Sequence, residues 1–171
     1  PMNTKKAKED LQKQVDEAVK AGAEVVYGNE PIDLPGQFFM PTILTNVDRD
    51  NPAYTTEMFG PIGVVYKVST EQEAIELAND SSYGLGGVVF AGDSEHGAEV
   101  ASQIETGMVF VNNFRYSLPE LPFGGVKRSG YGREMSRLGQ MAFVNEKLIV
   151  KADKPDMNKL AGGLVASSNP E

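Results

Sequence analysis

Cysteine is absent from the 171-residue sequence, and histidine occurs once, as His96. The first absence excludes disulfides, thiolate zinc sites and a cysteine nucleophile within this chain. The single histidine excludes a histidine dyad, and it excludes a metal site built on several imidazoles. Since His96 follows Ala-Gly-Asp-Ser-Glu at an expected helix start, we predict an exposed, non-catalytic side chain. No metal site is expected.

Long apolar runs and clustered positive charge are also missing. The longest apolar run, residues 85–91, contains two glycines and is far shorter than the roughly 20 residues of a membrane span. Residues 1–10 lack the apolar core of a signal peptide. The formal charge is −8, and the 16 basic residues are dispersed. We therefore expect a cytoplasmic protein that binds neither nucleic acid nor membrane.

The first part of the chain shows one clear helix pattern. Apolar residues at steps of three and four predict an amphipathic helix over 4–21, and Gly22 stands where it would end. Residues 23–27 read as a short buried strand closed by a Gly-Asn turn. A further strand is expected at Thr42–Leu44, after a segment rich in proline.

A regular alternation begins at residue 62. Apolar, β-branched runs alternate with two capped helix patterns at intervals of 22–24 residues, a spacing typical of two βαβ crossovers. The first helix is expected to open on a capping box of Ser69 and Gln72. We predict an α/β fold in which helices flank a parallel βαβαβ sheet. The expected strands are 62–68, 86–91 and 108–112, and the expected helices are 69–79 and 93–107.

Three segments follow this sheet. Residues 132–143 predict a short helix, and residues 145–153 alternate polar and apolar side chains as an edge strand does. Such a strand near a terminus is suited to pairing with another chain. The remaining tail has no periodicity and is expected to be disordered. The predicted organisation is a main domain over 1–142, an oligomerisation strand over 143–153 and a flexible tail over 154–171.

The stretch Leu121–Glu134, "LPFGGVKRSGYGRE", contains four glycines. A phosphate-binding loop would need the order Gly-Lys-Ser/Thr directly after a strand, and neither feature is present. We interpret the glycines as turn formers that permit close packing. A second notable segment, 56–63 or "TEMFGPIG", places Glu57 in a loop before a predicted strand, where α/β proteins hold ligands.

Four motifs then occur in one order: E-M-F-G-P (57–61), N-D-S-S-Y-G-L (79–85), G-M-V-F-V-N (107–112) and P-F-G-G-V-K-R-S-G-Y-G-R-E (122–134). With this order and spacing the chain resembles the C-terminal third of the NAD(P)-dependent aldehyde dehydrogenases. It is most similar to their succinate-semialdehyde dehydrogenase-like branch. The resemblance extends to about residue 151.

The resemblance implies roles for particular residues. Glu57 would bind the ribose hydroxyls on the nicotinamide side of NAD or NADP, and Phe59 would pack near the nicotinamide. Glu134 would be a buried member of a proton relay, and Arg133 would be a structural residue near a subunit interface. The aldehyde tunnel would be lined by Asn112, Arg115, Ser117 and Phe123, with Arg115 either pairing with a substrate carboxylate or lying free at the surface.

The same resemblance exposes what this chain lacks. The family attacks the aldehyde with a cysteine thiolate, passes hydride to the nicotinamide and hydrolyses the thioester with water activated by a glutamate. This chain has no cysteine and no glycine-turn nucleotide-binding unit. We expect it to be part of an enzyme that oxidises aldehydes, including succinate semialdehyde, and to be inactive alone. The alternative is a truncated, non-catalytic interaction module that self-associates or joins intact subunits.

Overall fold

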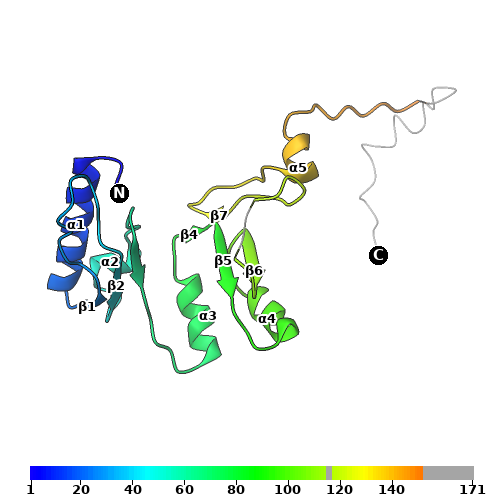
Figure 1. The fold of residues 1–171 in the computed structure, drawn as a ribbon. Coiled ribbons are helices and arrows are strands. Elements are labelled where there is room, and N and C mark those ends of the chain that lie inside the picture. Colours follow the sequence, from blue (N-terminus) through cyan, green and yellow to red (C-terminus); the bar gives the residue numbers. More distant parts are fainter. Residues whose placement is uncertain (115–116, 152–171) are drawn as a thin grey trace, which may run out of the picture.

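The computed structural model describes residues 1–114 and 117–151, and these form two lobes joined through residues 65–70 (Figure 1). The first lobe covers residues 5–64 and the second covers residues 71–141. The elements of the first lobe are α1 (Lys5–Lys20), β1 (Glu24–Tyr27), β2 (Thr42–Thr45), α2 (Pro52–Thr55) and β3 (Ile62–Val64). Those of the second are α3 (Glu71–Asn79), β4 (Tyr83–Gly84), β5 (Gly86–Val89), α4 (Ser94–Ala101), β6 (Met108–Val111), β7 (Val126–Lys127) and α5 (Ser136–Met141).

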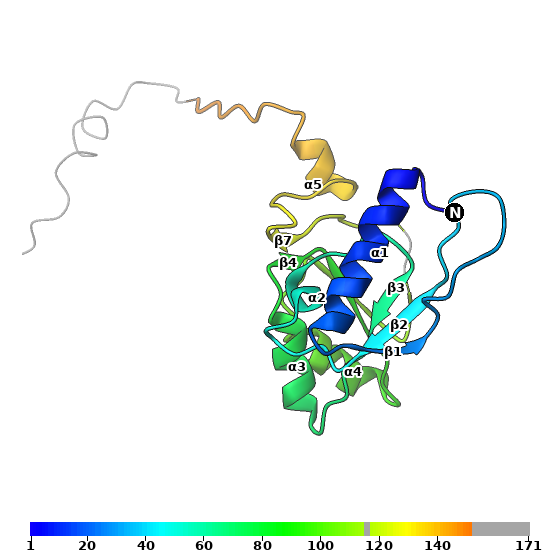
Figure 2. The same cartoon turned by 90° about the vertical axis from the view of Figure 1, so that its left-hand side faces the viewer.

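The expected first helix is confirmed as α1. Thr4 caps it by accepting a hydrogen bond from the backbone N–H of Ala7. The apolar stripe buries Leu11 and Val15 completely, and α1 lies across the first sheet (Figure 2). Burying each of these two side chains contributes about 1.5–3 kcal/mol.

The first sheet has the strand order β1-β2-β3, with β1 antiparallel and β3 parallel to β2. The expected strand at Thr42–Leu44 is confirmed as β2, whose Leu44 is fully buried. The prediction of a buried strand over 23–27 was wrong in its burial, because all four residues of β1 are exposed. β1 is an edge strand, and the core forms instead where α1 packs on β2.

The second lobe contains one parallel crossover. β5 and β6 pair in parallel through α4, as predicted, with Val88 opposite Phe110. The expected second crossover does not join one sheet, because within the described residues β3 pairs only with β2 and β5 only with β6. β3 is also shorter than the predicted 62–68. Periodicity identifies strands but does not specify their neighbours, so a helix between two strands does not prove that they pair.

The caps set the helix boundaries. The N-cap of α3 is one residue later than predicted, because Thr70 accepts a hydrogen bond from the N–H of Glu73, and the Glu73 carboxylate accepts one from the N–H of Ser69. The expected box of Ser69 and Gln72 was therefore wrong by one position. α4 has Asp93 as its N-cap but ends at Ala101, several residues before the predicted end at 107.

The C-terminal elements are shorter than expected. α5 covers six residues of the predicted 132–143. Its N-cap Met135 has a positive φ of 57° and its first residue, Ser136, a φ of 51°, so the helix does not extend toward residue 132. Residues 145–151 form no strand in this single chain and extend away from the second lobe (Figure 1). Leu148 is 87% exposed there. The last two residues of the predicted strand and the predicted flexible tail, 154–171, lie outside the described residues.

Buried apolar side chains are concentrated in the first lobe. Among the described residues, only Ile75 of the second lobe is a buried hydrophobic residue. The others are Leu11, Val15, Ala18, Ala23, Leu44, Val47 and Ala53. In the part of the chain that the structure describes, no helix has the length and apolar character to cross a bilayer.

Candidate active site

Glu57 lies at the edge of a cavity of about 610 Å³ between the two lobes. The short helix α2, capped by the buried Asn51, ends at Thr55, and the next turn carries Glu57 to the cavity. Its carboxylate is exposed and makes no hydrogen bond or ion pair with the described residues. The cavity is lined by Tyr54, Thr55, Thr56, Glu57, Ala78, Ser81, Tyr83, Gly84, Leu85, Gly86, Thr106 and Ser129.

The two sides of this cavity are held together at Asp80, which follows α3. The Asp80 carboxylate accepts a 2.6 Å hydrogen bond from the Tyr54 hydroxyl and lies 2.8 Å from the Arg49 guanidinium. The hydrogen bond to Asp80 raises the pKa of Tyr54 above its ordinary value, so the phenol stays protonated and keeps donating. These contacts fix the Glu57 loop against the start of the second lobe.

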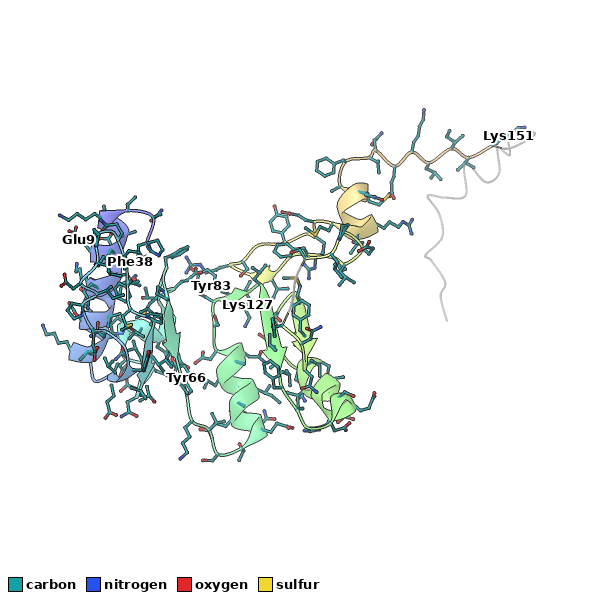
Figure 3. All side chains as sticks on the ribbon, viewed as in Figure 1. Glu9, Phe38, Tyr66, Tyr83, Lys127 and Lys151 are labelled. Carbon is teal, nitrogen blue, oxygen red and sulfur yellow. The ribbon has the colours of Figure 1, made fainter. Side chains whose placement is uncertain are left out.

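The glycine-rich stretch reaches the Glu57 cavity through Ser129. β7 pairs antiparallel with β4, which places Tyr83 opposite Lys127 (Figure 3). The Lys127 ammonium bonds the backbone carbonyl of Asn79 at 2.7 Å and lies 2.8 Å from Glu105. Ser129 accepts a hydrogen bond from the N–H of Gly84. These contacts connect three segments that are distant in sequence, namely residues 79–84, Glu105 and residues 126–129.

Close packing explains two of the glycines. A Cβ on Gly107 would overlap the backbone oxygen of Gly124, and one on Gly125 would lie 2.7 Å from the Cβ of Ser129. The loop interpretation of the glycine-rich stretch therefore fits the structure, since these backbones approach more closely than any side chain permits.

A second cavity, of about 500 Å³, lies between β6 and the loop that follows it. Two residues predicted for the aldehyde tunnel, Ser117 and Phe123, line it together. The full lining is Gly107, Met108, Val109, Phe110, Ser117, Leu118, Leu121, Pro122 and Phe123. Arg115 lies outside the described residues, so its predicted contact stays a prediction.

Asn112 is not among the residues that line this second cavity. Its side-chain oxygen accepts a 2.8 Å hydrogen bond from the N–H of Ala91, and its own N–H donates to the carbonyl of Val89. Its φ of 49° lies outside the range of a strand, so β6 ends before it, and its two hydrogen bonds connect the end of β6 to the end of β5. Asn112 therefore joins the ends of β5 and β6, just before the loop that lines the second cavity, and its predicted contact with an aldehyde stays a prediction.

Glu134 was expected to be buried, and that expectation was wrong: it is exposed and borders a separate cavity beside α5. Its backbone is held by two hydrogen bonds with Phe123. Neighbouring Arg133 donates to the carbonyls of Gly125 and Gly132 at 2.8 and 2.6 Å. The guanidinium of Arg133 stabilises this turn. Its predicted place near a subunit interface and the relay role of Glu134 stay predictions.

Phe59 and His96 lie apart from the two cavities. The Phe59 ring is 77% exposed two residues beyond Glu57, where a flat ligand could pack on it. His96 is exposed, as predicted, and its Nε2 lies 2.6 Å from the Glu71 carboxylate. Among the described residues, no group of three potential metal ligands is close enough to hold an ion.

Sequence reasoning missed Asp80 and Tyr54 as organisers of the Glu57 cavity. Asp80 belongs to the motif N-D-S-S-Y-G-L, but nothing in its spacing shows that it meets a tyrosine 26 residues earlier. Only the pairing of two lobes brings these side chains together.

Comparison with known proteins decides the family. Residues 1–149 match the model of the aldehyde dehydrogenase family. The chain belongs to this family. Among curated members, it is 50% identical over 149 residues to a succinate-semialdehyde dehydrogenase [NADP(+)] of Deinococcus radiodurans and 44% identical to that of Mycobacterium avium. These alignments cover 87% of this chain and 31% and 32% of the two relatives.

Solved aldehyde dehydrogenases share the fold. The succinic semialdehyde dehydrogenase of Streptococcus pyogenes, in complex with NADP+, is 56% identical and superposes with a TM-score of 0.86 over 90% of this chain and 34% of that one. A betaine aldehyde dehydrogenase of Staphylococcus aureus is 36% identical, with a TM-score of 0.85 over 91% and 32%. The chain thus spans about a third of the length of these aldehyde dehydrogenases.

Proposed function

We propose that this chain is the C-terminal part of an NADP-dependent aldehyde dehydrogenase that oxidises succinate semialdehyde to succinate. In this reaction the aldehyde and water yield the acid while NADP+ takes up a hydride and a proton is released. The free carboxylate of Glu57, at the edge of a cavity rich in hydroxyl groups, carries the proposal. The resemblance to enzymes named for this substrate and cofactor supports it.

The Glu57 cavity fits the ribose next to the nicotinamide. An ionised carboxylate accepts two hydrogen bonds, as two neighbouring ribose hydroxyls require. The described residues that line the cavity include no lysine or arginine, so it suits a neutral sugar better than a phosphate. The exposed ring of Phe59 offers a flat apolar surface for the adjoining ring. When bound, NADP+ would supply the hydride acceptor.

The second cavity fits a short aldehyde. Most of its side chains are apolar, which keeps water from the reacting carbon, while the Ser117 hydroxyl can donate to a carboxylate at the far end of the substrate. Arg115, two residues earlier, would add a planar cation for the same carboxylate. A carboxylate-bearing aldehyde would then be preferred over an uncharged one of equal length.

The nucleophile must come from elsewhere. The described lining of both cavities and the whole sequence contain no cysteine, so this chain shapes a site without the atom that attacks the aldehyde. We therefore propose that the isolated chain oxidises no aldehyde. A rise in reduced nicotinamide absorbance, when the purified chain meets succinate semialdehyde and NADP+, would contradict this.

The ribose contact is testable in a chimera. Residues 1–149 of this chain replace the aligned segment of the Deinococcus radiodurans enzyme, and the chimera is assayed with succinate semialdehyde and NADP+. Glu57→Gln removes the charge from the ribose acceptor. We expect its KM for NADP+ to rise roughly tenfold, since a hydrogen bond to a charged group contributes about 1.5 kcal/mol or more. The KM for the aldehyde should change much less.

Glu30→Gln is the matched control, because Glu30 is exposed and lines neither cavity. Equal kinetics for the Glu57 and Glu30 variants would remove the ribose assignment. In the same chimera, Arg115→Ala should reduce the preference for succinate semialdehyde over butanal. An unchanged preference would leave Arg115 without a role in substrate choice.

A further inference from the structure

Tyr54 belongs to a turn that is anchored to the core of the first lobe. α2 is a single turn, whose N-cap Asn51 is 2% exposed and donates a hydrogen bond to the carbonyl of Ala18 in α1. Ala53 is buried in the core, and the Tyr54 side chain packs against the same core. The Tyr54 ring therefore projects from a fixed turn, which gives its hydroxyl a defined position at the boundary of the first lobe.

Glu57 follows in the same anchored segment, three residues after Tyr54. The next residue, Met58, packs against the core of the first lobe, and its carbonyl accepts a 2.8 Å hydrogen bond from the N–H of Gly60. The chain is thus held to the first lobe both before and after Glu57. The position of the Glu57 carboxylate relative to the second lobe then depends on how the two lobes are held together.

The second lobe reaches the Glu57 cavity directly after Asp80. Asp80 is the C-cap of α3, which stands between the two sheets (Figure 1). The next residue, Ser81, lines the cavity together with Tyr83 and Ser129, which also come from the second lobe. A contact that holds Asp80 to the first lobe therefore sets how far the hydroxyl groups of these residues lie from Glu57.

Two polar contacts reach Asp80 from the first lobe, and they differ in strength. The Tyr54 hydroxyl donates to the Asp80 carboxylate at 2.6 Å, which is a short, charge-assisted hydrogen bond. The Arg49 guanidinium lies at 2.8 Å from the same carboxylate but is 75% exposed, and an exposed ion pair contributes little because water and salt screen it. The Tyr54 hydroxyl is therefore the stronger of the two contacts.

We propose that Tyr54 and Asp80 are positioning residues for the cofactor. Their hydrogen bond sets the separation between Glu57 and the hydroxyl groups of the second lobe, so that one ribose is held from both lobes. The identification of the sugar as the cofactor ribose rests on the proposed function. Since the Tyr54 hydroxyl already donates its proton to Asp80, its effect on the cofactor passes through Glu57.

The absence of cysteine allows a distance measurement in the 171-residue chain itself. Lys20→Cys in α1 and Ala98→Cys in α4 place one spin label at an exposed position of each lobe. Pulsed electron paramagnetic resonance then gives the distribution of distances between the two labels. We expect Tyr54→Phe, which removes only the hydroxyl, to shift and broaden this distribution. Tyr66→Phe is the matched control, because the Tyr66 ring lies 6.0 Å from that of Tyr54 and its hydroxyl makes no hydrogen bond with the described residues.

The kinetic test uses the chimera described above. Tyr54→Phe should raise the KM for NADP+ roughly threefold, less than Glu57→Gln does, because the carboxylate is displaced and not removed. The KM for succinate semialdehyde should change much less, and Tyr66→Phe should change neither. In a Glu57→Gln background, Tyr54→Phe should change the KM for NADP+ by less than about 1.5-fold, since no carboxylate is left to position.

Three outcomes would overturn the proposal. The first is the same distribution of distances for Tyr54→Phe and Tyr66→Phe, because the hydrogen bond would then not hold the lobes together. The second is a larger shift for Arg49→Gln than for Tyr54→Phe, which would assign the contact to the ion pair. The third is an equal effect of Tyr54→Phe on the KM for NADP+ with and without Glu57, as a purely structural role predicts.

A failure of the proposed function is recognised separately. Should Glu57→Gln leave the KM for NADP+ unchanged, the ribose assignment fails. The distance measurement uses no cofactor and no substrate, so it still decides whether the hydrogen bond between Tyr54 and Asp80 sets the separation of the two lobes.

Discussion

At the scale of single residues, the site depends on backbone approaches that only glycine allows. Gly107 directly precedes β6, which lines the second cavity, and its Cα faces the carbonyl of Gly124 in the glycine-rich stretch. The segments are 17 residues apart in sequence, and their contact sets the mouth of the cavity that Phe123 lines. A methyl group at position 107 would have to separate them.

We expect Gly107→Ala to lower the free energy of unfolding by roughly 2–3 kcal/mol, because a backbone oxygen cannot rotate away as a side chain does. Urea unfolding followed by circular dichroism measures this. Gly63→Ala is the control: a Cβ there meets no atom within 4 Å, so its effect should stay within about 0.5 kcal/mol. Equal midpoints for the two variants would contradict the close approach.

The residue scale is also where sequence reasoning was least complete. Ser117 and Phe123 could be assigned to one site because the family resemblance implied it, and the structure places both on one cavity. The burial of Glu134 could not be read from its motif, because burial depends on which segments cover a residue. Asp80 was missed for a related reason, since its partners Arg49 and Tyr54 come from the other lobe.

At the scale of elements, local signals were sufficient for helices and insufficient for sheets. Thr4, Thr70 and Asp93 each cap a helix within one residue of the expected start, because capping involves only neighbours in sequence. The pairing of β3 with β5 was wrong because strand order is decided by contacts between distant segments. β6 could be placed beside β5 since the intervening α4 packs on both.

One contact between elements should make stability depend on pH. His96 on α4 bonds Glu71 on α3 at 2.6 Å, and Glu99 lies 3.7 Å from its other ring nitrogen. The hydrogen bond to Glu71 raises the pKa of His96 above 6.5. The contribution of the charged pair is therefore complete below about pH 6.5 and is lost as the pH rises through the higher pKa of the folded state.

Between pH 6 and pH 8 we expect the Tm of the parent chain to fall further than that of His96→Gln, which has no titrating ring. Thermal unfolding at several pH values measures the difference, and Glu71→Gln should lower the pKa of His96 in an NMR titration. Parallel Tm curves for the parent and His96→Gln would show that the contact between α3 and α4 contributes nothing measurable.

At the scale of the whole molecule, the two lobes differ in how much apolar surface they bury. The first lobe places Leu11, Val15 and Leu44 in one core, whereas Ile75 is the single buried hydrophobic residue among those described in the second. The second lobe is held largely by polar contacts around Asn79 and Lys127. We therefore expect the first lobe to have a higher free energy of local unfolding than the second.

Amide hydrogen exchange tests the division directly. We expect amides of α1 and β2 to exchange on the order of 100-fold more slowly than those of β5 and β6, a ratio that one or two additional buried aliphatic side chains produce. Similar protection in the two lobes would contradict it.

The bridge between Phe123 and Glu134 has a practical consequence. Two backbone hydrogen bonds join the ends of this twelve-residue loop, and Tyr131 within it is fully exposed to solvent. A fluorescent label attached at position 131 would be carried by a loop whose two ends are hydrogen-bonded to each other. Tyr131 lines neither cavity. Its signal would therefore report changes around this loop while leaving the residues that line both cavities unaltered.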